Sequence, residues 1–285
     1  MTPVRRYPLT AIVLTQDEEI NIRDCLKTLA WADDVVVVDS GSRDRTIEIA
    51  RHERPDVRIF SHGFKDFGDQ RNWALDNAQS PHEWILFVDA DERIPADCAE
   101  AIQHAVGGAG GLVGFFLCAR TCFLGRWIRH STMFPSWQLR LLRRGAVRFQ
   151  KEGHGQREVA AGPLGYIETP YDHFGFSKGL EAWIARHNRY STEEIELIHR
   201  LRTEPLNILD AFGPPVARRR FLKRLAARIG GRPVMRFVYL YFLRGGWLDG
   251  RPGLLYCLLR MAHEIHIVAK MEERRCRLTD ERALH

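Results

Sequence analysis

Four consecutive valines, Val35 to Val38, constrain the fold of this chain more than any other feature. A β-branched run without polar alternation is typical of a strand that is buried on both faces, and such strands belong to parallel sheets covered by helices. Shorter apolar runs occur at residues 9–14, 57–60 and 84–88. Helical patterns separate these runs, so the first hundred residues predict a doubly wound α/β arrangement.

Helix-start signals lie between the predicted strands. Asp17 is expected to cap a helix over residues 19–29, and Ser42 to cap one that runs to about His52. Residues 70–77 also have a helical pattern. Pro95 stands where proline favours the first turn of a further helix.

The pattern changes after residue 107. Residues 112–118, 138–142 and 147–150 are predicted strands without intervening helices, which indicates an added antiparallel or mixed section. From Ser177 the pattern is helical, and the basic helical stretch 217–269 is interrupted at 230–233 and 245–246. We therefore expect an α/β domain over residues 1–176, with a mixed sheet flanked by helices, and a helical basic C-terminal extension over residues 177–285.

Composition narrows the class of protein. With 45% hydrophobic and 27% charged residues, the chain is neither disordered nor fibrous. The net charge of +6 favours a polyanionic partner, namely nucleic acid, an anionic membrane surface or a phosphorylated ligand. The six cysteines show no zinc or disulfide spacing, which fits a reducing compartment. We expect neither a signal peptide nor a membrane-spanning segment, and hence a cytoplasmic protein.

Carboxylates follow two of the predicted strands. Asp39 ends the second strand, and Asp89-Ala90-Asp91 ends the fourth. Ligands of open α/β sheets bind at the carboxyl ends of the strands, where Asp39 could accept hydrogen bonds from a ribose or a base. Asp89 and Asp91 in extended backbone would project to the same side and could hold one hard divalent cation.

Five motifs around these positions occur in a characteristic order. They are Asp17–Ile22, Trp31–Val38, Asp39–Asp44, Gln70–Asn72 and Phe87–Glu92. Together they resemble the nucleotide-sugar-binding half of the family 2 glycosyltransferases, which have the GT-A (Rossmann-like) fold. Within that family the chain is similar to the lipopolysaccharide-core β-glucosyltransferases of the WaaE (KdtX) type. The likeness is strong over residues 9–95 and weaker to about residue 195.

The resemblance implies a nucleotide-sugar site. Asp39 would contact the uridine of a UDP-sugar, and Thr15 and Glu18 would border the same nucleoside pocket. Arg71 would lie near the base or the diphosphate, its alternative being a charge on a solvated helix face.

The resemblance also implies a metal. Asp89 would face the ribose or the metal, and Asp91 would be the firmer metal ligand. The ion would be Mg²⁺ or Mn²⁺, which accept oxygen ligands and stabilise the charge that grows on a leaving diphosphate.

An inverting transfer also needs a general base for the acceptor hydroxyl. Relatives carry Val-His-Glu after a strand; here His154 matches, but a glycine follows it. Glu152, beside His154, is therefore the first choice of catalytic base, and Glu158 and Asp172 are the second choices. His154 and His173 would bind an acceptor phosphate or carboxylate, or only satisfy loop carbonyls.

The C-terminal part carries seven Arg and Lys residues between Arg218 and Arg232, followed by an aromatic stretch from Phe237 to Trp247. This pattern fits a helix that lies on an anionic membrane. The alternative is a helix that packs its apolar face on the domain and leaves its charges in water. A nucleic-acid partner is not expected, because no nucleic-acid-binding module accompanies the charges.

These features predict a cytoplasmic, membrane-peripheral glycosyltransferase. It would move a hexose, with glucose favoured by the resemblance, from a UDP-sugar to a lipid-linked or envelope-glycan acceptor such as lipopolysaccharide core, with inversion. A nucleotidyltransferase is the enzymatic alternative, but residues 15–19 lack the glycines that would hold a triphosphate. A non-catalytic membrane-docked scaffold is the other, and Asp39, Asp89 and Asp91 argue against it.

Overall fold

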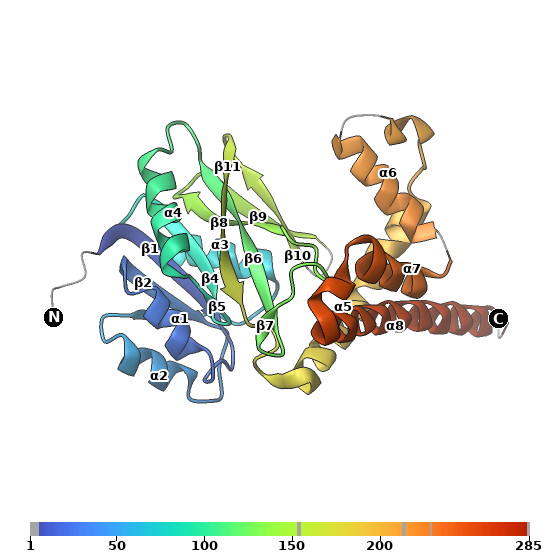
Figure 1. Ribbon diagram of the computed structural model, residues 1–285, viewed down its shortest axis with the longest axis horizontal. Coiled ribbons are helices and arrows are strands. Elements are labelled where there is room, and N and C mark those ends of the chain that lie inside the picture. Colours follow the sequence, from blue (N-terminus) through green and yellow to red (C-terminus); the bar gives the residue numbers. More distant parts are fainter. Residues whose placement is uncertain (1–5, 153–154, 213–214, 229, 284–285) are drawn as a thin grey trace. The chain divides into compact units, whose positions relative to one another are not determined.

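The chain folds into two units. The computed structural model describes residues 6–152, 155–212, 215–228 and 230–283. The first unit comprises the chain up to Arg129 together with Met133–Gly179, and the second comprises His130–Thr132 and the chain from Leu180. The first unit is α/β and the second is helical (Figure 1). The roles expected of residues 1–176 and 177–285 stay predictions.

A mixed sheet forms the centre of the first unit. Its strand order is β3-β2-β1-β4-β8-β6-β11-β5, and the short strand β7 pairs with β6. Strands β3, β2, β1 and β4 are parallel, whereas β8 is antiparallel to both of its neighbours, β4 and β6. The strands are β1 (Tyr7–Thr15), β2 (Ala32–Asp39), β3 (Arg58–Ser61), β4 (Trp84–Asp89), β5 (Glu92–Arg93), β6 (Gly114–Phe123), β7 (Arg126–Trp127), β8 (Trp137–Arg143) and β11 (Leu164–His173).

Helices cover both faces of this sheet. The helices are α1 (Ile22–Thr28), α2 (Thr46–Glu53), α3 (Phe67–Asn77) and α4 (Ala96–Gly107). Val35 and Val37 pack in the same cluster as buried residues of α1, α2 and α4, whereas Val36 and Val38 pack with those of α3. Successive side chains of a strand point to opposite faces, so alternate valines of the run pack in two different cores, one on each face of the sheet. The predicted α/β architecture with a mixed sheet flanked by helices is confirmed.

The section added after residue 107 supplies β6, β8 and β11 to the main sheet and a separate hairpin. This hairpin joins β9 (Val147–Glu152) and β10 (Gly155–Ala160) as an antiparallel pair. Phe149 of β9 is buried in the cluster below α3, and Asn72 of α3 exchanges hydrogen bonds with its backbone at 2.8 and 3.0 Å. The hairpin is therefore fixed to α3, next to the carboxyl ends of the parallel strands.

The second unit consists of helices. They are α5 (Gly179–Thr203), the 3₁₀ turn η1 (Ile208–Ala211), α6 (Pro215–Arg228), α7 (Arg232–Val238), the π-helical turn η2 (Tyr239–Leu243), the 3₁₀ turn η3 (Gly246–Asp249) and α8 (Gly250–Ala283). The break between α6 and α7 and the break before η3 fall at the glycines where the sequence predicted interruptions, in residues 230–233 and 245–246. Ile198, Ala227 and Ile267 bring α5, α6 and α8 together in a small core. None of the helices in the described ranges is long and apolar enough to cross a membrane.

Candidate active site

The carboxyl ends of three adjacent parallel strands bring the predicted nucleotide residues together. Thr15 of β1 is the register partner of Asp39 of β2, and Leu14 of β1 is the partner of Asp89 of β4. Asp39 and Asp89 therefore flank the end of β1 on its two sides. The sequence predicted that these residues lie at one edge of the sheet, and the strand register agrees.

Asp39 shapes the turn that follows β2. Its side chain is buried, and its carboxylate accepts hydrogen bonds from the Gly41 and Ser42 amides at 3.1 and 3.0 Å. Gly41 has a φ of 86°, in the left-handed region that glycine adopts without steric cost. Asp39 thus has a structural role in this turn, and its contact with a nucleoside stays a prediction.

The loops after β1 and β2 are joined by hydrogen bonds. The Asp17 amide donates to Ser42 Oγ at 2.8 Å, and the Arg43 amide donates to the Asp17 carboxylate at 2.7 Å. The expectation that Asp17 and Ser42 cap helices is wrong. The N-caps of α1 and α2 are Asn21 and Arg45, and the two expected caps instead bond across the loops. Local sequence could not show this choice, because the partners are about 25 residues apart.

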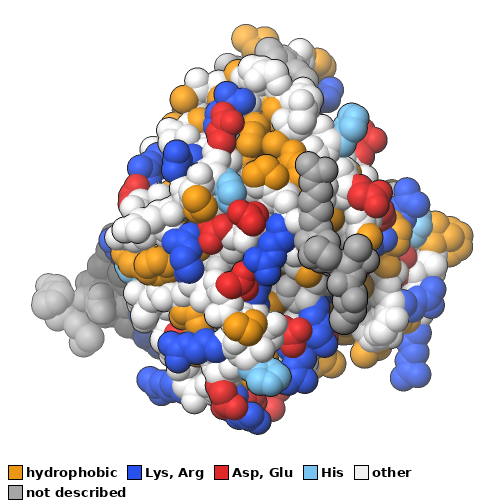
Figure 2. Space-filling model, turned by 90° about the vertical axis from the view of Figure 1, so that its left-hand side faces the viewer, with side chains coloured by type: hydrophobic (Ala, Val, Ile, Leu, Met, Phe, Trp, Pro, Cys, Tyr) orange, Lys and Arg blue, Asp and Glu red, His pale blue; other side chains and the backbone are white. Residues whose placement is uncertain are grey.

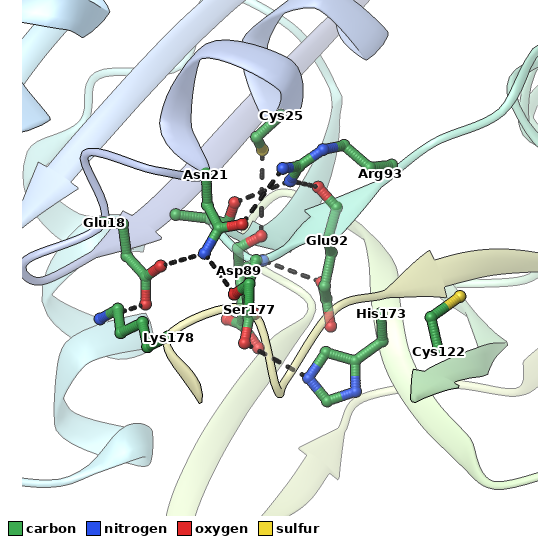
Figure 3. A network of polar contacts seen from close by, with 12 residues as sticks. Glu18, Asn21, Cys25, Asp89, Glu92, Arg93, Cys122, His173, Ser177 and Lys178 are labelled. Carbon is green, nitrogen blue, oxygen red and sulfur yellow. Dashed lines mark hydrogen bonds and ion pairs between the residues drawn. The ribbon is translucent and has the colours of Figure 1, made fainter. Parts of the chain in front are cut away.

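Thr15 and Glu18 lie buried beside this pair of loops. The Thr15 hydroxyl has no hydrogen-bond partner within the part of the chain that the structure describes. Glu18 accepts hydrogen bonds from Asn21 Nδ2 at 2.6 Å and from Lys178 Nζ at 2.7 Å, and Asn21 also reaches Ser177 (Figure 3). Burial raises the pKa of Glu18, and the bonds from Lys178 and Asn21 oppose that rise.

Asp89 lies between two buried arginines. Its Oδ1 is 3.2 Å from Arg71 Nη2, and its Oδ2 is 2.8 Å from Arg140 Nη2. Burial alone would raise the pKa of Asp89, but the two guanidinium groups hold it well below its usual range. Both carboxylate oxygens are therefore occupied by protein cations, which fits poorly with the predicted role of Asp89 as a metal ligand.

Asp91 points to a different partner. The chain turns at Ala90 and Asp91, so the assumption that Asp89 and Asp91 lie in extended backbone is wrong. Asp91 Oδ2 lies 3.4 Å from Nε2 of His173, at the end of β11. Burial would lower the pKa of His173, but the Asp91 carboxylate raises it to about 9. His173 is therefore cationic at neutral pH and balances Asp91.

Arg71 is buried, so the alternative of a solvated helix charge is wrong. Its side chain is 4% exposed, and its guanidinium lies over the Phe87 and Phe149 rings and donates to Gln156 Oε1 at 3.2 Å. Arg71 links α3, β4 and the β9–β10 hairpin below the strand ends. The predicted contact with a base or diphosphate stays a prediction.

Arg140, Glu92 and Tyr171 are the residues of this site that sequence reasoning missed. Arg140 bonds both Asp89 and Glu92, and it lies over the Tyr171 ring at 5.6 Å. Glu92 also accepts the Asp89 amide at 2.9 Å, and burial raises the pKa of Glu92 to about 7. Two features of the sequence could have indicated these residues. Glu92 directly follows Asp-Ala-Asp, and Arg140 lies within an apolar strand, where a charge without a partner would be costly.

The candidate general bases lie at the β9–β10 hairpin and on β11. Glu152 is exposed at the end of β9, opposite Gly155. His154 lies outside the described residues. Glu158 is on β10, and Asp172 accepts a hydrogen bond from Arg120 Nε at 2.6 Å. The role of a general base stays a prediction for each of these carboxylates.

The described residues do not form a ready-made metal cage. Among them, no group of three or more His, Cys, Asp or Glu side chains could hold an ion. Asp91 fits a ligand of Mg²⁺ or Mn²⁺ better than Asp89 does, because its ion pair with His173 is a longer contact made by Oδ2, whereas both oxygens of Asp89 are bound by arginines. On the face shown in Figure 2, acidic and basic side chains are interspersed and form no continuous basic surface.

Comparison with known proteins gives the family. Residues 10–158 match the family model "Glycosyl transferase family 2", so the chain belongs to this family and is a glycosyltransferase.

Two curated relatives illustrate the likeness. The lipopolysaccharide core biosynthesis glycosyltransferase LpsC of Rhizobium meliloti (strain 1021) is 25% identical over 282 residues, which cover 95% of this chain and 94% of LpsC. The SPbeta prophage-derived glycosyltransferase SunS of Bacillus subtilis (strain 168) is 37% identical over 85 residues, 29% of this chain and 20% of SunS. Among solved structures, S. aureus TarS 1–349 is 14% identical with a TM-score of 0.45, and the match covers 93% of this chain and 89% of that one.

Proposed function

We propose that this family 2 glycosyltransferase moves a hexose, with glucose as the first candidate, from a UDP-sugar to a lipid-linked or cell-envelope glycan such as lipopolysaccharide core. The observation that supports a UDP-sugar as the donor is that Thr15, Asp39 and Asp89 lie at the ends of adjacent strands. Similarity to LpsC along nearly the whole length of both chains supports the proposed acceptor class.

In this proposal the loops after β1 and β2 bind the nucleoside. Hydrogen bonds between the two loops hold Asp39 and Glu18 in fixed positions, and Thr15 lies beside them at the end of β1. Fixed polar groups lose little conformational freedom on binding, which favours affinity.

The diphosphate would lie beyond the end of β4. Asp91 would hold Mg²⁺ or Mn²⁺, which when bound neutralises charge on the leaving diphosphate. Arg71 and Arg140 hold Asp89 and so fix the strand end from which Asp91 projects. A carboxylate of the hairpin region, Glu152 first, would accept the proton of the acceptor hydroxyl in an inverting transfer.

The experiment that tests this function measures UDP release. The protein is incubated with UDP-glucose, other UDP-sugars and GDP-sugars, with Mn²⁺ or Mg²⁺ and an acceptor extract of lipopolysaccharide core. Thermal shift with the same donors gives an independent readout, since a ligand at 100 times its Kd stabilises by about 2.7 kcal/mol. Stabilisation by GDP-sugars alone would contradict the UDP assignment. Donor binding without transfer to any envelope glycan would contradict the acceptor class.

Because such an acceptor is lipid-linked, the enzyme would work at the cytoplasmic face of the cell membrane. Of the seven basic residues expected to dock there, three are engaged within the second unit. Arg224 pairs with Glu204, Arg228 donates to the Arg202 carbonyl, and Arg232 pairs with Glu264. The basic stretch is therefore less available to a membrane than its sequence indicates.

A further inference from the structure

A band of exposed apolar side chains runs along α7, η2 and η3 in the second unit. Consecutive elements of this series contact one another. The eight residues of this band, from 38% exposed at Tyr239 to 75% at Leu243, are Val234, Met235, Val238, Tyr239, Phe242, Leu243, Trp247 and Leu248. Exposed aromatic and aliphatic side chains in one band mark an interaction surface rather than scattered surface residues.

The band is held in place by its buried side. Leu240, the second residue of η2, is 2% exposed. A Cβ on Gly246 would lie 2.6 Å from the Leu240 carbonyl oxygen, so only glycine allows this close packing of η3 on η2. The Asp249 carboxylate, at the end of η3, accepts the His130 and Ser131 amides at 2.9 and 2.7 Å. The apolar side chains are therefore presented by an anchored segment.

The charge around the band is positive. Residues 233–248 contain no acid and, apart from two arginines and two tyrosines, no polar side chain. Over residues 230–251 there are four arginines and one acid, the buried Asp249. Arg232 and Arg236 pair with Glu264 of α8, so the four arginines outnumber the acids near them, and Arg251 is exposed. A protein partner or a second copy would have to offer a matching apolar surface that carries no positive charges at its edge. An anionic lipid surface offers both an apolar layer for the band and negative charge for the arginines.

We propose that the band from Val234 to Leu248 inserts into the interfacial layer of an anionic lipid membrane. Phe242 and Leu243 enter the acyl boundary, and Tyr239 and Trp247 lie at the headgroup level, where amphipathic rings are favoured. The exposed Arg251 and the net positive charge around the band attract the lipid headgroups. This inference concerns the second unit and does not depend on the donor or acceptor proposed above.

The experiment is sedimentation of the full chain with vesicles of phosphatidylglycerol and phosphatidylethanolamine, and with phosphatidylcholine vesicles for comparison. The protein should sediment with the anionic vesicles, and part should stay bound at high salt. Phe242→Ser with Leu243→Ser should weaken binding about tenfold or more, because two large apolar side chains no longer insert. Circular dichroism and thermal unfolding should stay as in the parent, since both side chains are exposed.

The matched control is Leu209→Ser with Phe212→Ser, a pair of the same residue types that is at least as exposed and lies beside Asp210. It should leave vesicle binding nearly unchanged. Brominated lipid should quench the tryptophan fluorescence of the parent more than that of Trp247→Phe. Such a difference would place the Trp247 ring in the bilayer. Absence of binding by the parent, equal loss in both double variants, or a dimer that Phe242→Ser with Leu243→Ser dissociates would each overturn the inference. Donor-dependent UDP release should be the same in all soluble variants.

Discussion

Arg140 Nη2 lies 2.8 Å from Asp89 Oδ2, although 51 residues separate them in the chain. The same guanidinium holds Glu92, and Arg71 holds the other oxygen of Asp89. Two buried cations thus balance two carboxylates at the end of β4. Asp91 has its own cation, His173. Each acid of the Asp-Ala-Asp-Glu segment therefore has a basic partner from a distant part of the chain.

Arg140→Met should destabilise the protein strongly. It leaves Glu92 buried without its cation and Asp89 with Arg71 alone, and breaking a buried pair by removing one partner costs about 3–5 kcal/mol. Urea unfolding measures this loss. The double variant Arg140→Met with Glu92→Gln should recover part of it, because the uncompensated carboxylate is gone. A double variant no more stable than the single one would show that the charge pairing is not the cause.

Asp91→Asn should keep the fold and lower transfer by about 100-fold or more, because a neutral amide is a poor ligand for a hard cation. Activity of the parent should disappear in EDTA and return with Mn²⁺ or Mg²⁺. The matched control is His173→Gln, which breaks the same ion pair but keeps the carboxylate. An equal loss in both variants would assign the effect to the pair rather than to a metal. Full turnover in EDTA would remove the metal from the reaction.

Much of the fold could be predicted because it follows from local pattern. The valine run gave a strand buried on both faces, and Pro95 gave the start of α4 within one residue. The cap assignments of Asp17 and Ser42 failed for a physical reason. Each side chain had a second partner in the neighbouring loop, and only the parallel pairing of β1 with β2 brings those loops together.

The candidate site was predicted in part. The positions of Asp39 and Asp89 followed from the rule that parallel strands end at one edge. The partners of the acids did not follow, because Arg140 and His173 arrive on β8 and β11, in the mixed section of the sheet. No spacing rule connects these later strands to a motif about 50 or more residues earlier. The turn at Ala90 likewise separated two carboxylates that an extended backbone would have put together.

Asp39→Ala should weaken UDP binding and also loosen the turn after β2. The Gly41 and Ser42 amides would lose their acceptor, at a cost of about 1–3 kcal/mol in stability. Asp39→Asn keeps an acceptor oxygen and should be less destabilised, while UDP binding still falls. Calorimetric titration with UDP and thermal unfolding separate the two effects. If UDP binds the alanine variant as tightly as the parent, Asp39 acts only in the turn. Metal dependence should be unchanged in both variants.

His187, on α5, should make stability depend on pH. Burial lowers its pKa to about 3 against 6.5 for a free side chain, although its bond to the Trp183 carbonyl at 2.9 Å opposes the shift. Arg260, His263 and Arg186 face it and add repulsion of a proton. Between about pH 3 and pH 6.5, His187 is therefore protonated in the unfolded chain and neutral in the folded chain.

The free energy of unfolding should therefore rise with pH through this interval and level off above about pH 6.5, because the unfolded state holds more protons there. Urea unfolding at several pH values between about 4 and 8 measures the slope. His187→Gln removes the titrating group, so its slope below pH 6.5 should be smaller than that of the parent. His199→Gln, at an exposed position on the same helix, should keep the parental slope. Parallel curves for the parent and His187→Gln would show that His187 accepts its proton as readily in the folded chain as in the unfolded one.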